Sequence, residues 1–164
     1  MTGNVDAPAA RSHGALIISA SPMNGSEQFP PRALYTWGYQ GRSYDDLRGV
    51  VREHGITQVF DVRRSARSRD PRWCDWNLCK EPDFALLYET LYGELGNANH
   101  AKRGEWVPLD ASKATAWIEF LGDYDLLHGG HALLMCMERR ADDCHRKIVA
   151  ELVSARHGCE VIHL

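Results

Sequence analysis

Residues 132–138 read ALLMCME, and after a short polar turn residues 143–146 read DCHR. An apolar run that opens into polar residues and then into an amphipathic stretch predicts a buried strand, a loop and the start of a helix. In α/β proteins, ligands bind outside the carboxyl ends of the strands. The stretch therefore predicts an α/β fold whose functional side chains gather at the end of this strand.

Apolar periodicity on the amino-terminal side of this stretch predicts a strand, a helix and a second strand. The strands cover residues 33–37 and 56–62, and the helix between them opens at Ser43 and ends before Gly55. Asp46 stands three residues after Ser43, as in a capping box. A strand–helix–strand unit of about 30 residues predicts two parallel strands joined by a right-handed crossover.

Further helices are expected over residues 111–121 and 143–157, and further strands over 131–136 and 160–164. Residues 65–83 are expected to be irregular. Residues 84–90 fit either a strand or a helical turn, because short apolar runs cannot be assigned by period alone. Together these elements predict a single three-layer, Rossmann-like α/β domain with a mainly parallel sheet.

The predicted domain covers residues 33–164, and residues 1–32 are expected to form a flexible extension because Gly, Ser, Pro and Asn recur there. Within the extension, residues 15–19 (ALIIS) fit a short strand with no evident partner.

The composition limits the classes of protein to which the chain belongs. The 164 residues are 44% hydrophobic and 25% charged, which is typical of a globular domain. A formal net charge of -3 argues against a protein that coats nucleic acid through its overall charge. No apolar run approaches the roughly 18 residues that a membrane helix needs, and no secretory signal is evident. The five cysteines have no disulfide-framework spacing, so we expect reduced thiols and a cytoplasmic protein.

Polar side chains follow the ends of three predicted strands and the start of the last helix. We expect them at one rim of the sheet: Gly38, Tyr39, Asp61, Arg63, Arg64, Cys136, Glu138, Cys144, His145 and Arg146. Such convergence is more specific than any of these residues alone. Gly38, Tyr39 and Cys136 are candidate ligand contacts. Arg63, Arg64 and Arg146 are candidate anion ligands, assisted by the free N–H groups of the helix start.

The catalytic candidates have two interpretations each. Glu138 and Asp61 fit a pair of carboxylates that act as acid and base, but Asp61 equally fits an ion pair with an arginine, and Glu138 a cap on the following turn. Cys144 beside His145 fits a nucleophile with its base. Adjacent helix residues point about 100° apart, however, so Cys144 also fits a small packed side chain.

Cys136, Cys144 and His145 also fit three ligands of a zinc ion, with His100 or His163 as the fourth. The C-x7-C-H spacing lacks the usual short pair of cysteines, so no cofactor is the primary expectation and zinc the alternative.

An arginine-rich stretch follows the second strand. Five arginines lie between residues 63 and 72, and Trp73 and Trp76 come directly after them. Arginine with aromatic side chains suits phosphate contacts and base stacking. For the outer arginines, Arg67, Arg69 and Arg72, the favoured interpretation is a solvated loop, whereas Arg63 is expected to face the rim.

These motifs together resemble the bacterial and archaeal family called domain of unknown function 488. The resemblance rests on Thr36-Trp37-Gly38-Tyr39, Asp61-Val62-Arg63, residues 66–69, residues 95–97, and Cys136-Met137-Glu138 with Cys144-His145-Arg146. It covers residues 34–164, and it implies a Rossmann-like α/β fold without defining an activity. The D-V-R strand end also occurs in rhodanese-like domains. Their C-x5-R loop is lacking here, because Asp142 stands in its arginine position.

The sequence thus favours an enzyme, a hydrolase or transferase, that binds a phosphorylated or otherwise anionic ligand at the rim, a nucleotide or a nucleic-acid segment. The alternatives are a non-catalytic ligand-binding or regulatory module and a zinc-binding domain. No membrane partner is expected, and the oligomeric state is left open.

Overall fold

The computed structural model describes residues 33–65, 67–85, 87–99 and 105–164. The expected extension over residues 1–32 and the candidate zinc ligand His100 lie outside the described residues. The helices and strands are β1 (Ala33–Gly38), α1 (Tyr44–Glu53), β2 (Ile56–Asp61), α2 (Asp75–Leu78), β3 (Tyr88–Thr90), α3 (Ala111–His128), β4 (His131–Cys136), α4 (His145–His157) and β5 (Glu160–His163), with 3-10 turns η1 (Pro71–Trp73) and η2 (Ala141–Asp143).

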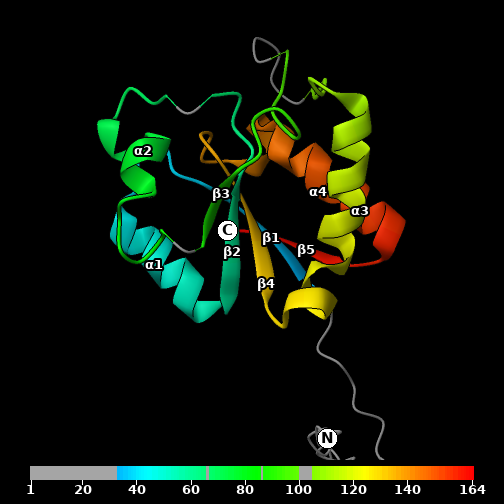
Figure 1. The fold of residues 1–164 in the computed structure, drawn as a ribbon, viewed down its shortest axis with the longest axis horizontal. Helices are drawn as coiled ribbons and strands as arrows, with labels where there is room; N and C mark the ends of the chain where they lie inside the picture. Colours follow the sequence, from blue (N-terminus) through cyan, green and yellow to red (C-terminus); the bar gives the residue numbers. More distant parts are fainter. Residues whose placement is uncertain (1–32, 66, 86, 100–104) are drawn as a thin grey trace, which may run out of the picture.

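The strands form one five-stranded sheet in the order β3-β2-β4-β1-β5, and every pair of neighbours is parallel (Figure 1). β4 lies at the centre, which explains its continuous apolar sequence, because a central parallel strand is covered on both faces. The predicted three-layer α/β class with a parallel sheet is confirmed.

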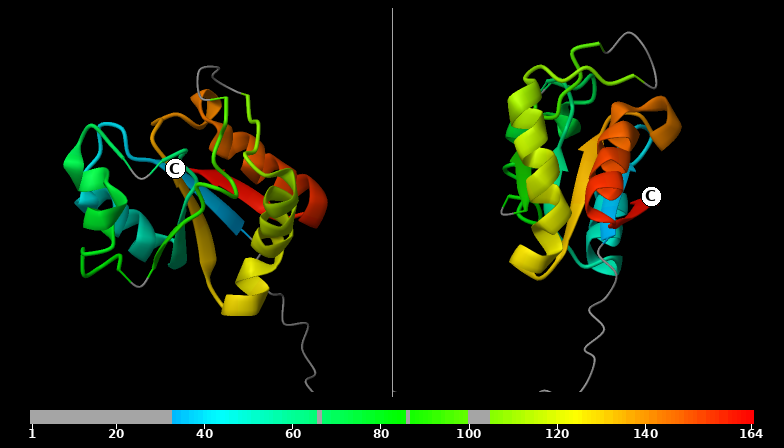
Figure 2. Two further views of the ribbon diagram at one scale, coloured as in Figure 1. Left: turned by 45° about the horizontal axis from the view of Figure 1, so that its top comes forward. Right: turned by 90° about the vertical axis from the view of Figure 1, so that its right-hand side faces the viewer.

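Helices cover both faces of the sheet. α1 and α2 lie on one face and α3 and α4 on the other, as the views in Figure 2 show. The alternation of side chains along β4 divides the core accordingly: Leu134 and Cys136 pack in the core beneath α3 and α4, whereas Leu133 and Met135 pack in the core beneath α1 and α2.

The order of the strands creates a switch point between β1 and β4. From β1 the chain runs through α1 toward β2, and from β4 it runs through α4 toward β5, in the opposite direction along the sheet. The two connections therefore leave neighbouring strands toward opposite faces. In open α/β sheets this point opens a crevice at the carboxyl ends of the strands, and ligands bind there.

Most of the expected elements are present, with corrections at their ends. The predicted helix over 111–121 continues to His128, because residues 122–128 contain no proline, Gly122 is tolerated as a buried helix residue, and Gly129 provides the left-handed stop. α4 begins at His145 rather than at 143, because residues 141–143 form the turn η2 and Cys144 is the N-cap. β2 ends at Asp61, one residue earlier than expected.

The middle of the chain is more regular than expected in one part and less in another. The stretch 65–83, expected to be irregular, contains η1 and α2. Among the described residues of 84–90 the strand is Tyr88–Thr90, β3, which pairs with the end of β2. None of the helices in the described part of the chain is long and apolar enough to cross a membrane.

We expect Gly38→Ala to destabilise the fold by about 1–3 kcal/mol, the usual cost of overpacking. A Cβ atom at Gly38 would overlap the main-chain carbonyl of Glu138, which cannot move like the end of a flexible side chain. Gly49→Ala is the control, because Gly49 lies within α1 with open space around its Cα. It should raise the free energy of unfolding by about 0.5–1 kcal/mol. Equal effects of the two variants in urea denaturation would contradict the expectation.

The capping box of α1 should give the protein a pH-dependent contribution to stability. The main-chain N–H and the hydroxyl of Ser43 both donate to Asp46, which lowers the pKa of this carboxyl. A lowered folded-state pKa stabilises the protein above the unfolded-state pKa, and the gain is lost as pH falls through the folded-state pKa. The difference in urea midpoint between wild type and Asp46→Ala should therefore be largest near neutral pH and shrink in acid. A constant difference would contradict this.

Candidate functional site

The loops that follow β1 and β4 meet at the switch point. The N–H of Tyr39 donates to Cys136 O (3.2 Å), and the N–H of Gln40 donates to Met137 O (3.0 Å). These bonds continue the β1–β4 pairing beyond the strands, and they depend on the missing side chain of Gly38. The two loops that border the crevice are therefore fixed relative to each other.

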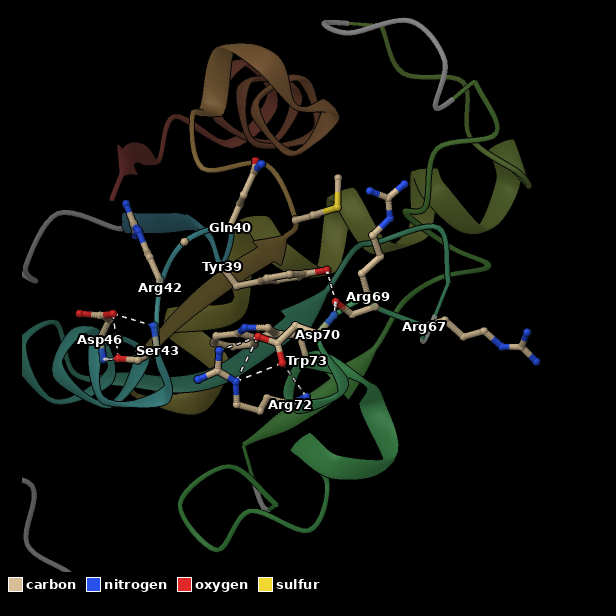
Figure 3. A pocket seen from close by; sticks show the side chains of 13 residues that line it. Tyr39, Gln40, Arg42, Ser43, Asp46, Arg67, Arg69, Asp70, Arg72 and Trp73 are labelled. Atoms are coloured by element: carbon tan, nitrogen blue, oxygen red, sulfur yellow. Dashed lines mark hydrogen bonds and ion pairs between the residues drawn. The ribbon is translucent and has the colours of Figure 1, made fainter.

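A cleft of about 800 Å³ opens beside these loops, on the side of α1 (Figure 3). The β1–α1 loop, the start of α1, the stretch 67–73 and Met137 supply its lining. The residues are Tyr39, Gln40, Gly41, Arg42, Ser43, Asp46, Arg67, Ser68, Arg69, Asp70, Arg72, Trp73 and Met137.

Four arginines and two aspartates line the cleft, and the aspartates have other partners. Asp70 forms an ion pair with Arg72 (2.6 Å), and Asp46 accepts the two capping hydrogen bonds from Ser43. No described carboxylate pairs with Arg67 or Arg69, which are exposed.

Arg42 is held among other cations. Its guanidinium lies over the ring of Trp37, 5.1 Å from the ring centroid. Burial and then the nearby charges of Arg139 and Arg146 lower its pKa. The cleft is therefore locally cationic although the whole chain is acidic.

The aromatic lining of the cleft is a stacked pair. The rings of Tyr39 and Trp73 are 4.8 Å apart and nearly parallel, and the Tyr39 hydroxyl donates to Ser68 Oγ (3.3 Å) (Figure 3). Both aromatic side chains are more than nine-tenths buried. They therefore give the cleft a rigid lining.

Asp61 and Arg63 form a buried ion pair at the end of β2. Arg63 Nε donates to both carboxylate oxygens of Asp61 (2.8 Å each), and Arg63 Nη2 makes a further short contact with Oδ2. The Asp61 side chain is fully buried. This geometry is the ion-pair alternative that the sequence left open for Asp61. A role for Asp61 as acid or base stays a prediction without support from its surroundings.

The same guanidinium reaches three other segments. Arg63 Nη1 donates to Trp73 O (2.6 Å), and Nη2 lies 3.4 Å from Tyr88 Oη and 3.5 Å from Tyr92 Oη. Burial alone would lower the pKa of Arg63, but the hydrogen bonds and charge of Asp61 outweigh it and raise that pKa. Arg63, predicted to face a ligand, is thus occupied in joining β2 to the segments around η1 and β3.

A second cluster lies at the end of β4, on the side of α4. The side chains of Cys136, Cys144 and His145 are all buried, and their sulfur and ring nitrogen atoms lie within 4.8 Å of one another. Cys144 Sγ is 3.9 Å from His145 Nδ1. The other ring nitrogen, Nε2, lies 2.7 Å from the carbonyl oxygen of Val62.

The cluster shifts the protonation of its members. The hydrogen bond with Cys136 lowers the pKa of Cys144, and the same bond raises the pKa of Cys136. Burial would lower the pKa of His145, but its hydrogen bond and charge interaction with Cys144 raise it. Without any ligand, Cys144 is the sulfur that ionises first.

Glu138 borders this cluster. The Cys136 thiol donates to Glu138 Oε2 (3.3 Å), and the side chain is partly buried. Burial, followed by the nearby Cys144, raises the pKa of Glu138. Met137, the residue before it, lines the arginine cleft. Glu138 is therefore the next residue after Met137 of the cleft, and its carboxylate contacts the thiol of Cys136.

The remaining arginine candidates differ in exposure. Arg146 is fully buried, and its guanidinium donates to the main-chain carbonyls of Glu138 and Arg139. Its fork, expected to hold an anion, is thus occupied by the β4–α4 loop. The start of α4 is likewise capped, since Cys144 Sγ accepts from the N–H of Arg146 (3.5 Å). Arg64 is exposed.

The predicted rim residues therefore separate into three groups. Gly38 and Tyr39 adjoin the cleft, Asp61 and Arg63 form the ion pair, and the third group is the cluster of Cys136, Glu138, Cys144 and His145. His163, named as a possible fourth zinc ligand, bonds instead to Thr36 Oγ1 (2.7 Å).

The sequence reasoning missed Arg42 and Met137, which line the cleft. A usable signal was their position: each stands in a loop directly after a strand of the predicted sheet. The outer arginines Arg67, Arg69 and Arg72, for which a solvated loop was favoured, also line the cleft.

Comparisons of the chain with protein-family models, curated proteins and solved structures found no match. The resemblance to the domain of unknown function 488 family stays a prediction.

Replacing Asp61 by Asn should cost about 3–5 kcal/mol of stability, because the change leaves the buried Arg63 guanidinium without its counter-charge. Glu151→Gln is the control, since the exposed Lys147–Glu151 pair of α4 should contribute at most about 0.5 kcal/mol. Urea denaturation at neutral pH measures both. A loss below about 1 kcal/mol in Asp61→Asn would show that the pair contributes no more than a surface contact.

Proposed function

We propose that the protein is an enzyme that binds a phosphorylated ligand, a nucleotide or a nucleic-acid segment, in the arginine-lined cleft. The observation that carries the proposal is the placement of four arginines around one cleft at the carboxyl ends of β1 and β2. Functional sites of parallel α/β sheets form at this place because the loops there diverge.

The charge of the cleft favours an anion. Arg72 is neutralised by Asp70, but Arg67 and Arg69 have no ion-pair partner among the described carboxylates. Arg42 is repelled by Arg139 and Arg146, and a bound anion would relieve that repulsion. A guanidinium also offers two parallel N–H donors, which match the oxygens of a phosphate.

The size and lining of the cleft favour a ligand larger than an inorganic ion. Its volume of about 800 Å³ lies in the range of about 300–1,000 Å³ that is usual for small-molecule sites. Tyr39 and Met137 add apolar surface, and Gln40 and Ser68 add hydrogen-bonding groups. A phosphorylated compound with an organic part, such as a nucleotide, suits this mixture.

Glu138 is the candidate acid or base of the proposed enzyme. It is a partly buried carboxylate in the loop that borders the cleft, and no described arginine or lysine forms an ion pair with it. Its carboxylate contacts Cys136 and does not line the cleft, so a ligand would have to extend from the cleft past Met137 to reach it; proton transfer there would suit hydrolase or transferase chemistry.

The binding test uses the full chain and two ligands, ATP without added metal and a short single-stranded oligonucleotide, in isothermal titration calorimetry. Arg69→Ala and Arg42→Ala should each weaken binding about tenfold, since a charged hydrogen bond contributes about 1.5–3 kcal/mol. Arg52→Ala, an exposed arginine of α1 outside the cleft lining, is the matched control and should bind as wild type does.

For the oligonucleotide, each cleft variant should also reduce the slope of log K against log salt by about 1. Absence of binding to both ligands would contradict the proposal. So would equal affinities in wild type, Arg42→Ala and Arg69→Ala.

A non-catalytic binding module is the second candidate. The burial of Asp61, Cys144 and His145 favours it, because three of the four predicted catalytic side chains are buried. Glu138→Gln separates the two functions: it should abolish turnover of a bound substrate while leaving its affinity within about twofold of wild type. Full turnover in this variant would show that Glu138 is not the acid or base, and a substrate bound by wild type without turnover would leave only the binding module.

A further inference from the structure

The cluster at the end of β4 contains three side chains of the types that bind transition metals. Cys136 is the last residue of β4, Cys144 is the N-cap of α4, and His145 is the first residue of that helix. The geometry points to a metal site: we propose that Cys136, Cys144 and His145 bind a divalent transition metal ion of the zinc class. The proposal does not depend on the arginine cleft or on its ligand.

The separations of the ligand atoms suit such an ion. Zinc binds sulfur at about 2.3 Å and imidazole nitrogen at about 2.0–2.1 Å, so neighbouring ligand atoms of a tetrahedral site lie about 3.5–3.8 Å apart. The Sγ atoms of Cys136 and Cys144 and one ring nitrogen of His145 already lie within 4.8 Å of one another, and Cys144 Sγ is 3.9 Å from His145 Nδ1. The separations therefore exceed those of a closed site by at most about 1 Å.

His145 is oriented as a metal ligand requires. Its Nε2 lies 2.7 Å from Val62 O, and a carbonyl oxygen can only accept a hydrogen bond, so Nε2 carries the hydrogen. In the neutral ring, Nδ1 then has the free lone pair, and Nδ1 is the nitrogen that faces Cys144. Metal-bound histidines commonly donate their second ring N–H to a carbonyl or carboxylate in this way.

The surroundings also suit two ionised sulfurs. The N–H of Arg146 donates to Cys144 Sγ (3.5 Å), and the buried Arg146 guanidinium adds a positive charge nearby. A divalent ion with two thiolates and a neutral imidazole carries no net charge. The remaining charges, on Arg146 and Glu138, are of opposite sign. A metal-bound cluster therefore balances its charge inside the protein, where an uncompensated charge is costly.

The competing explanation is a catalytic thiolate with a histidine base. A nucleophile must reach its substrate, but Cys144 is only 2% exposed and His145 8%. That explanation also gives no part to Cys136, a second buried sulfur in the same cluster. A metal site uses all three side chains and needs no exposed surface at the sulfurs.

Three protein ligands leave a fourth position of the metal for water or another group. Glu138 Oε2 lies 3.3 Å from the ligand atom Cys136 Sγ, but it is not one of the three atoms that converge. Zinc sites with an open position and a nearby carboxylate that is not a ligand are typical of hydrolytic enzymes.

The first measurement is the metal content of the full chain, purified without chelator or tag-bound metal, by inductively coupled plasma mass spectrometry. Wild type should hold stoichiometric zinc, and Cys136→Ser and Cys144→Ser should lose it. Cys159→Ser is the matched control and should retain the metal, because Cys159 is a buried cysteine of the same core outside the cluster.

Cobalt substitution of wild type keeps the test independent of whether the variants fold. The cobalt protein should show thiolate-to-metal charge transfer in the near ultraviolet and the intense visible bands of a tetrahedral site. Wild type that binds neither zinc nor cobalt overturns the proposal. Metal retained by folded Cys136→Ser and Cys144→Ser at wild-type stoichiometry overturns it as well, since the ion would then lie elsewhere.

Discussion

The guanidinium of Arg63 joins the segments that lie around the cleft. It is buried with Asp61 at the end of β2 and donates to the main chain of Trp73. The two tyrosines beside it, Tyr88 and Tyr92, belong to β3 and the loop that follows. A buried ion pair contributes little to stability by itself, because desolvation offsets its attraction. Its effect is geometric, since one guanidinium joins the end of β2 to Trp73, Tyr88 and Tyr92.

This constraint explains why an arginine-rich stretch with few regular elements can line a cleft. The stretch 67–73 has two short helical turns at or after its end, and it returns to the core where Trp73 stacks on Tyr39. Because Arg63 donates to the main-chain carbonyl of Trp73, the position of Trp73 is fixed. The exposed Arg67 and Arg69, which precede it, therefore stay near the β1–α1 loop. The D-V-R sequence thus supports the cleft without lining it. Its position at the end of a strand had instead suggested direct contact with a ligand.

The sequence predicted the sheet and the side chains at its rim because both depend on local patterns. Apolar runs marked β1, β2 and β4, and the Ser43–Asp46 capping box marked the start of α1. The partners of each rim side chain depend instead on contacts between distant segments. Nothing local shows that Arg63 turns toward Trp73, or that Arg146 folds back on the β4–α4 loop. For Cys136, Cys144 and His145, the sequence identified the residues of the cluster. That their side chains meet is evident only from the structure.

The buried Arg146 has a consequence for the loop that joins β4 to α4. Its guanidinium holds the carbonyls of Glu138 and Arg139, while its own N–H is bonded to Cys144 Sγ. Arg146 thereby links the start of the loop, just after β4, to its end at the start of α4, and the loop is closed into a ring. A ring of this kind has already lost most of its conformational entropy during folding, so a ligand that binds to it later loses little more. Part of the entropic cost of ordering this loop for a ligand is therefore already met when the chain folds.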